Sequence, residues 1–317
     1  MSVNQTEGNG DTIKFTYVYM TFSAATLAEC LLAGYVTFLN RDLRRKLSFW
    51  FSSSLMVSIG IFSSLSFVYA IVLVSTPILL DNVPANCQVK LVQRYLSAVC
   101  CLNITCLALD RYVAICWPLR YNNILTEARC RQLCIACWVS PIVCLMLPCV
   151  NILTTMCSKK GKDLNFLVAY SVVYSIGALA TFIFYILVAL EFRHEFRGQP
   201  HDENKATTEA LVRRKTAKSA LQVFMLYTVL SVPHTLIPLF SRILPVAKWM
   251  VLGSHLVHRL HLLLFLPMYS LASISFFASL KALGLHLWRK VTCATDSLQQ
   301  MSPTEMSFAH DSTVGGL

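Results

Sequence analysis

Two groups of charged side chains stand inside long apolar stretches of this sequence. Asp110 and Arg111 are adjacent near the end of one stretch, in LALDRYVAICWPLRY (107–121). The second group combines three histidines with an arginine: His255, His258, Arg259 and His261. A charge in apolar surroundings needs a partner or a function. An arginine here could anchor the end of a membrane helix, or it could form an ion pair with the adjacent acid that is kept or broken.

The same stretches contain many cysteines without the spacing of a metal centre. Most of the 13 cysteines lie in apolar runs, where Cys behaves as a small hydrophobic residue. Cys134 and Cys137 form a C-x-x-C, but no second pair accompanies them. The sequence has neither a nucleophile–base pair nor a phosphate-binding glycine loop. We therefore predict no enzyme activity, no metal and no cofactor.

Composition indicates an integral membrane protein. Of the 317 residues, 56% are hydrophobic and only 14% are charged, whereas a soluble domain carries about a quarter charged residues. The mean hydropathy is +0.57. The net charge of +11 comes from short basic clusters between apolar runs. This pattern is typical of membrane topology and argues against nucleic-acid binding.

Seven apolar stretches are long enough to cross a bilayer, which takes about 20 residues. They are 15–39, 48–76, 87–110, 131–153, 164–190, 218–240 and 250–278. The expected fold is thus an all-α membrane protein with a seven-transmembrane helix bundle at 15–278. It is preceded by an outer tail at 1–14 and followed by an amphipathic helix at 279–292 along the inner leaflet and a disordered cytoplasmic tail at 293–317.

The orientation of the bundle follows from its basic residues. With the N-terminus outside, 18 of the 27 Lys and Arg residues fall on the inner side, as positive-inside orientation requires. Residues 1–12 are polar, so the first span is expected to act as its own insertion signal. Asn4 begins a glycosylation sequon in the outer tail. We expect a multi-pass protein of the plasma membrane.

Three further cysteines lie outside the membrane in this topology. Cys87 and Cys157 would both face the oxidising side and are the expected disulfide pair, with Cys149 as the competitor for Cys157. Cys293 follows the amphipathic helix and is a candidate for palmitoylation, although it could equally be an exposed thiol.

The stretch LALDRYVAICWPLRYNNILTEARC (107–130) resembles the signature of rhodopsin-like G-protein-coupled receptors, and within them that of odorant receptors. The matching residues are Asp110, Arg111, Tyr112, Val113, Ala114, Ile115, Cys116, Pro118, Leu119, Tyr121 and Ile124. Other landmarks depart from the family: span 2 lacks its Asp, and FLPMYSLASI in span 7 is a poor match to N-P-x-x-Y. We interpret the chain as a divergent branch, of a fish type.

The resemblance implies a mechanism. At rest Arg111 pairs with Asp110, beside Tyr112; when span 6 moves outward, Arg111 turns toward a heterotrimeric G protein. The implied partners are that G protein, a small-molecule odorant and membrane lipid.

The expected ligand site is a cavity between the outer halves of spans 3, 5, 6 and 7. Gln93, Ser97 and Cys101 share one helical face by their spacing of four residues. Gln93 stands where amine receptors carry an Asp, which argues against an amine ligand. The further candidates are Tyr170, Tyr174, Tyr227 and His234.

The charged group in span 7 has two interpretations. His255 and Arg259 could recognise an anionic ligand, such as a carboxylate or sulfate. Alternatively, the group pairs with Glu29 of span 1, which is expected to neighbour span 7.

Two alternatives to an odorant receptor also stay open. One is a receptor of the same class for a lipid or a peptide. The other is a transporter or channel, which the odd number of spans and the lack of an internal repeat disfavour.

Overall fold

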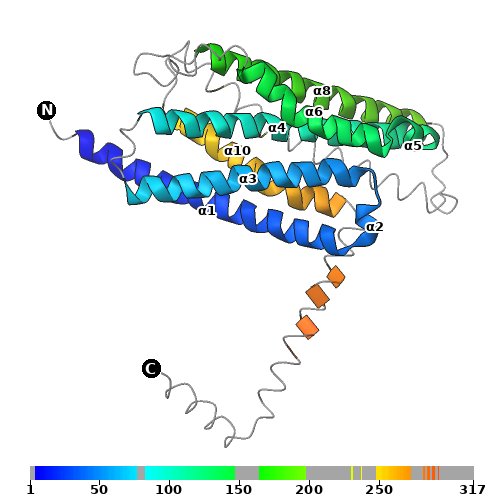
Figure 1. The fold of residues 1–317 in the computed structure, drawn as a ribbon, viewed down its shortest axis with the longest axis horizontal. Helices are drawn as coiled ribbons and strands as arrows, with labels where there is room; N and C mark the ends of the chain where they lie inside the picture. Colours follow the sequence, from blue (N-terminus) through cyan, green and yellow to red (C-terminus); the bar gives the residue numbers. More distant parts are fainter. Residues whose placement is uncertain are drawn as a thin grey trace, which may run out of the picture. The chain divides into compact units, whose positions relative to one another are not determined.

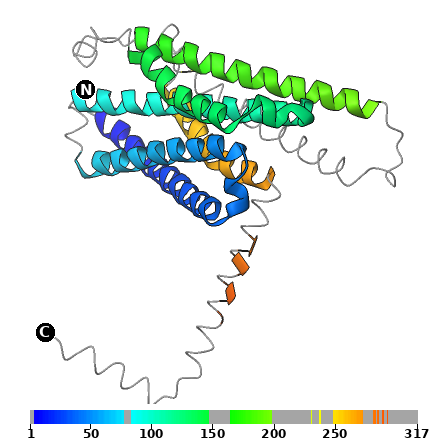
Figure 2. The same cartoon turned by 45° about the vertical axis from the view of Figure 1, so that its right-hand side comes forward.

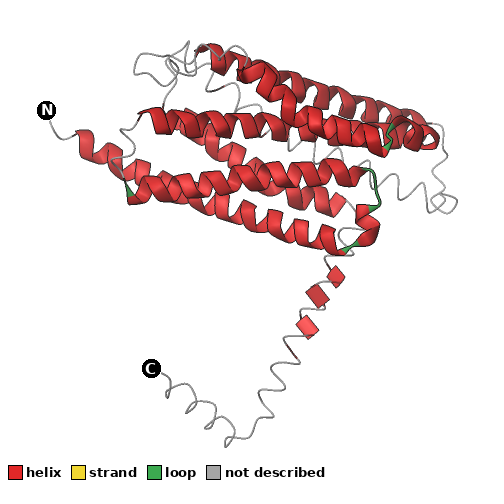
Figure 3. Cartoon of the chain, viewed as in Figure 1, coloured by secondary structure: helices red, strands yellow, loops and turns green. Residues whose placement is uncertain are grey.

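The computed structural model describes residues 4–76, 83–146, 164–197 and 248–272. It also describes single positions at Leu230, Ile237, Lys281, Ala282, Gly284, Leu285, Trp288, Arg289 and Thr292. Nearly all of these residues are helical (Figure 3). The chain divides into two compact units, Met1–Ser273 and Ile274–Leu317, and the bundle described below belongs to the first.

Six long helices make up the described part of the bundle. The first five run alternately in opposite directions, and the sixth runs in the same direction as the fifth (Figure 1). They are α1 (Asn4–Leu39), α3 (Ser48–Ser75), α4 (Val83–Cys116), α6 (Glu127–Met146), α8 (Leu164–Arg197) and α10 (Lys248–Ala272). Short helices follow α1 and α4: α2 (Arg41–Arg44), η2 (Pro118–Arg120) and α5 (Tyr121–Ile124). Of the predicted sixth span, 218–240, only Leu230 and Ile237 are described, and both are helical.

Four of these helices are long and apolar enough to cross a membrane. The qualifying segments are Phe15–Leu39, Ser48–Ser75, Gln88–Cys116 and Ala169–Glu191. They agree with the predicted spans 15–39, 48–76, 87–110 and 164–190, because about 20 apolar residues in one helix match the thickness of the hydrocarbon core.

Large apolar side chains cover the outer surface of these helices. They recur at helical spacing on α1, α6 and α8: Leu31, Tyr35, Phe38, Ile135, Val139, Ile142, Ile176, Leu179 and Ile183. Apolar surface on this scale is unfavourable in water and natural in lipid. The outward faces are therefore the lipid-facing surface of the bundle.

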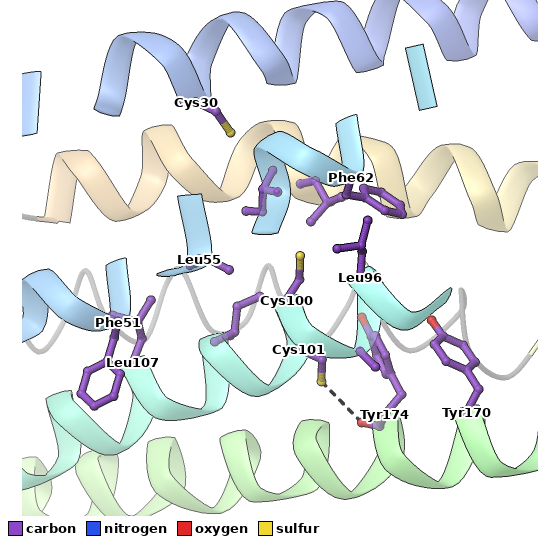
Figure 4. Close-up of a cluster of buried hydrophobic side chains, with 14 of the residues drawn as sticks. Cys30, Phe51, Leu55, Phe62, Leu96, Cys100, Cys101, Leu107, Tyr170 and Tyr174 are labelled. Carbon is purple, nitrogen blue, oxygen red and sulfur yellow. Dashed lines mark hydrogen bonds between the residues drawn. The ribbon is translucent and has the colours of Figure 1, made fainter. Parts of the chain in front are cut away.

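Helix α4 lies at the centre of the bundle. It packs against α3, α6 and α8, while α1 packs against α3 and α10 (Figures 1 and 2). Side chains of α4 join those of α3 and α8 in one buried apolar cluster (Figure 4). Its labelled members include Phe51, Leu55, Leu96, Cys100 and Tyr174. Most functional side chains predicted in span 3 are therefore held between neighbouring helices.

A glycine lets α4 and α8 approach closely. A Cβ added to Gly177 would lie 2.8 Å from Cys101 Sγ and 3.4 Å from Thr105 Oγ1. The Thr105 hydroxyl lies 3.0 Å from the Gly177 carbonyl oxygen and 2.9 Å from the hydroxyl of Thr181. Small residues and hydroxyl contacts of this kind hold helices together in membranes, where burial of apolar surface gives no net driving force.

Two helices extend beyond the predicted spans. Helix α1 begins at Asn4, within the predicted tail at 1–14, although its apolar segment begins at Phe15. Helix α4 continues past Asp110 to Cys116 and stops before Pro118. A proline disfavours helical conformation in the residue before it, so Pro118 and not the charge pair sets this end.

Candidate functional site

Asp110 is buried near the end of α4, with only 1% of its surface exposed. The Tyr121 hydroxyl donates a hydrogen bond of 2.6 Å to Asp110 Oδ1. Arg111 Nε lies 3.9 Å from Asp110 Oδ2, at the limit of an ion pair. The carboxylate is thus held on one oxygen by a neutral donor and on the other by a cation. A short, charge-assisted bond such as the first is the stronger kind.

The turn after α4 positions Tyr121. The Trp117 N–H bonds to the Val113 carbonyl oxygen at 3.0 Å, and Pro118 then opens η2, where a proline loses no hydrogen bond. The chain folds back, so that Tyr121 begins α5 beneath the end of α4. Burial raises the pKa of the Tyr121 hydroxyl, and the charge of Asp110 raises it further. Tyr121 therefore keeps its proton and remains a donor.

Arg111 and Tyr112 follow Asp110 near the end of α4. About a quarter of the Arg111 side chain is exposed. Tyr112 packs against Trp117 and against Phe184 of α8, with ring centroids 5.3 and 5.7 Å apart. An open cavity of about 730 Å³ lies beside it, lined by Tyr112, Cys116, Trp117, Leu187, Leu190, Glu191 and Arg193. This end of the bundle thus offers a binding surface next to the charge pair.

The predicted ligand face of α4 meets three different helices. Gln93 Nε2 lies 3.2 Å from Ser66 Oγ of α3. Cys101 Sγ donates to the Tyr174 carbonyl oxygen of α8 at 3.6 Å (Figure 4). These residues share a side of α4, but each contacts a different neighbour.

Ser97, between them, connects α8 and α10. Its hydroxyl lies 3.1 Å from the Tyr170 hydroxyl and 3.3 Å from His258 Nε2. Ser97, Tyr170, Tyr174 and His258 are all buried. The Ser97 hydroxyl thus links polar atoms of α8 and α10 in a buried polar centre.

Arg259 of α10 is buried at 3% exposure. Its Nη2 donates to Ser66 Oγ at 2.6 Å and also to the hydroxyl of Tyr19 on α1. The guanidinium carbon lies 4.2 Å from the centre of the Tyr19 ring and 4.1 Å from that of Phe62. Arg259 therefore joins α1, α3 and α10.

Glu29 is not a partner of this group in the described part of the chain. Arg259 meets α1 at Tyr19, about 15 Å along the helix axis from Glu29 at 1.5 Å per residue. Glu29 Oε2 is buried without a hydrogen-bond partner among the described residues. His255 is exposed, whereas His258 and His261 are buried. The structure thus gives Arg259 aromatic and hydroxyl neighbours instead of the carboxylate.

Several predicted residues lie outside the described residues: Tyr227, His234, Cys157 and Cys293. Asn4 and Cys87 belong to α1 and α4, but their side chains are outside the described part. The disulfide, glycosylation and palmitoylation sites stay predictions.

Three important contacts have no signal in the sequence. Tyr121 is recognisable in the matching stretch, but only the turn at Pro118 brings it to Asp110. Tyr19 and Ser66 belong to two other helices, and only helix packing brings them to Arg259.

Comparison with known proteins gives one family match and several short, closely similar stretches. The chain matches the 7 transmembrane receptor (rhodopsin family) over residues 30–274. It is 44% identical over 52 residues to Olfactory receptor 11G2 of Homo sapiens, covering 16% of this chain and 15% of that protein. It is 50% identical over 48 residues to Olfactory receptor 6B9 of Mus musculus, covering 14% and 15%. The aligned stretch thus spans about 15% of the length of these relatives.

Proposed function

The chain belongs to the rhodopsin family of seven-transmembrane receptors, and we propose that within this family it is an odorant receptor. The family match confirms the predicted seven-transmembrane fold and a multi-pass membrane protein. The identities with olfactory receptors support the finer assignment, although they cover only short stretches. In this proposal a small extracellular molecule binds the bundle and a heterotrimeric G protein is activated on the inner side.

The single observation that carries the proposal is the buried carboxylate at the end of α4. Asp110 lies between the Tyr121 hydroxyl and the Arg111 guanidinium. Arg111 is always charged, so leaving either partner of the pair buried and alone costs several kcal/mol. The contact between Arg111 and Asp110 is long and lies at the edge of the bundle, so Arg111 can exchange Asp110 for another acceptor at small net cost. The pair therefore suits a two-state switch.

The proposed direction of signalling follows from this placement. The end of the bundle that carries Asp110, α2 and α5 is the cytoplasmic one, because its loops hold the basic clusters. A ligand at the opposite end moves span 6 outward and frees Arg111 for the G protein. The cavity beside Tyr112, between the ends of α4 and α8, is the adjoining surface available to that partner.

The remaining features belong to the same proposal. The protein is of a divergent, fish-type branch, lies in the plasma membrane and has its N-terminus outside. Asn4 is glycosylated, Cys87 pairs with Cys157, and Cys293 is palmitoylated. The ligand site is built from Gln93, Ser97, Cys101, Tyr170, Tyr174, Tyr227, His234, His255 and Arg259.

An exchange assay with one substitution tests the proposal. Membranes containing the receptor and a heterotrimeric G protein are exposed to an odorant panel, and nucleotide exchange is measured together with surface expression. At least one odorant should accelerate exchange on the unaltered receptor, and Arg111→Ala should abolish this at equal expression. Arg120→Ala is the matched control, because Arg120 lies in η2, directly after α4, and is exposed.

The outcomes separate the alternatives. If Arg111→Ala supported the same odorant-driven nucleotide exchange as the unaltered receptor, the proposed role of Arg111 as a switch would be refuted. Activation only by lipids or peptides would assign the other ligand class. Solute flux through reconstituted vesicles without a G protein would identify a transporter.

A further inference from the structure

Hydrogen-bond donors outnumber acceptors where α1, α3, α4 and α10 meet around Arg259. Two hydroxyl oxygens, those of Tyr19 and Ser66, accept from both Arg259 and Gln93. A guanidinium carries five N–H donors and no acceptor, and a side-chain amide adds two more donors and one acceptor oxygen. Arg259 Nη1 is buried and has no hydrogen-bond partner among the described residues. The site is therefore rich in donors and poor in acceptors.

The site also carries a positive charge, which favours the same kind of partner as its excess of hydrogen-bond donors. Arg259 stays ionised even when buried, and in the part of the chain whose side chains are described no carboxylate contacts it. Lys90 and Arg94 of α4 add positive charge around the nearby His255. An uncompensated cation away from water costs several kcal/mol, so these side chains together favour an anion.

Aromatic rings fix the orientation of the guanidinium. Tyr19 and Phe62 each lie close to Arg259, with their ring centres 4.2 and 4.1 Å from its central carbon. Cation–π contacts stabilise the charge in part, but they use the faces of the guanidinium and leave its edges free to donate. The Nη1 group, in the plane of the guanidinium, is thus presented at a fixed angle to an acceptor.

We infer that Arg259, Gln93, Tyr19 and Ser66 form a binding site for a small monoanion, in the first place a carboxylate. A carboxylate only accepts hydrogen bonds, and one of its oxygens can accept from Arg259 Nη1, which is buried without a hydrogen-bond partner among the described residues. The same chemistry could come from an organic acid or from free chloride. The statement that an organic acid is the agonist rests on the proposed function. The statement that the site binds an anion does not rest on it.

Thermal unfolding of the purified full-length receptor in detergent tests the site. The background is a zwitterionic buffer of low ionic strength without added carboxylate or halide, and the additions are sodium propanoate, sodium chloride or neutral propanamide. Propanoate at saturation should raise the melting temperature by about 3 °C or more, and propanamide should not. Chloride tests the inorganic source of the same chemistry. Arg259→Met, which preserves side-chain length without charge, should remove the response to both anions.

Gln93→Glu provides the second variant, and it does not remove the arginine. A carboxylate at position 93, close to Ser66 and Tyr19, would supply the acceptor from within the chain. This variant should melt at a higher temperature than the unaltered receptor and should no longer respond to propanoate or chloride. It decides the matter alone if Arg259→Met does not fold.

The inference is overturned if propanoate and propanamide act equally, or if neither anion shifts the melting temperature. The inference is also overturned if anions still raise the melting temperature of Arg259→Met. It is likewise overturned if Gln93→Glu melts at a lower temperature than the unaltered receptor and still responds to anions. The readout does not depend on signalling. If anions raise the melting temperature but no odorant drives nucleotide exchange, the anion site is supported and the proposed function is refuted. If an odorant drives exchange but no anion raises the melting temperature, the proposed function is supported and the anion site is refuted.

Discussion

Replacing Tyr121 by Phe removes one hydroxyl and leaves the ring in place. That hydroxyl makes the 2.6 Å bond to the carboxylate of Asp110, which is 1% exposed. A hydrogen bond to a charged group contributes about 1.5–3 kcal/mol, because the buried acceptor cannot recover it from water. We expect the melting temperature to fall by roughly 3–12 °C, at about 2–4 °C per kcal/mol for a chain of this size.

The assay is thermal unfolding of purified receptor in detergent, with Tyr35→Phe as the matched control. Tyr35 is an exposed tyrosine of α1, so the loss of its hydroxyl should change the melting temperature by less than about 1 °C, as for other surface substitutions. The comparison isolates the position of the hydroxyl from the chemistry of the substitution.

A double-mutant cycle with Asp110→Asn then tests the partner. If the bond to Asp110 is the cause, Tyr121→Phe should cost less in the Asp110→Asn background, with a coupling of about 1 kcal/mol or more. Equal losses in both backgrounds, or no loss in the single variant, would refute the argument that Tyr121 stabilises this carboxylate.

Two further substitutions test the packing around α4. Gly177→Ala should lower the melting temperature by an amount corresponding to about 1–3 kcal/mol, because its Cβ would lie 2.8 Å from Cys101 Sγ; Gly34→Ala, with nothing within 4 Å, should not. Ser97→Ala should destabilise by about 1–3 kcal/mol, because Tyr170 and His258 lose a buried partner. Ser63→Ala is its control, since the Ser63 hydroxyl is buried without a hydrogen-bond partner in the described structure, and it should be neutral or stabilising.

The sequence predicts the helices of this protein well and the contacts between them poorly. The span at 15–39 agrees with Phe15–Leu39 because hydropathy and length are properties of the segment alone. The predicted span 87–110 ends at Asp110, where the apolar run stops, but hydrogen bonding continues the helix to Cys116 until Pro118 intervenes. Charge marks the boundary of the membrane, whereas proline marks the boundary of the helix.

The candidate site shows the same limit in three dimensions. The spacing of Gln93, Ser97 and Cys101 predicts that they share one side of a helix, yet it cannot tell that these residues meet α3, α10 and α8 in turn. The two interpretations of the charge in span 7 also depended on packing. Arg259 lies against Tyr19 because α1 and α10 cross at that level, and no pattern within either helix encodes the crossing.

The enclosed position of α4 has a consequence for inherited variation. Ala98, Val99 and Ala108 have no exposed surface, so there even an added methyl group must displace a neighbouring helix. On α8, positions such as Ile176 and Leu179 face lipid and should accept any apolar residue. Natural alleles that enlarge these α4 positions are therefore expected to fold poorly, and those altered on the outer row of α8 should fold as the unaltered chain does.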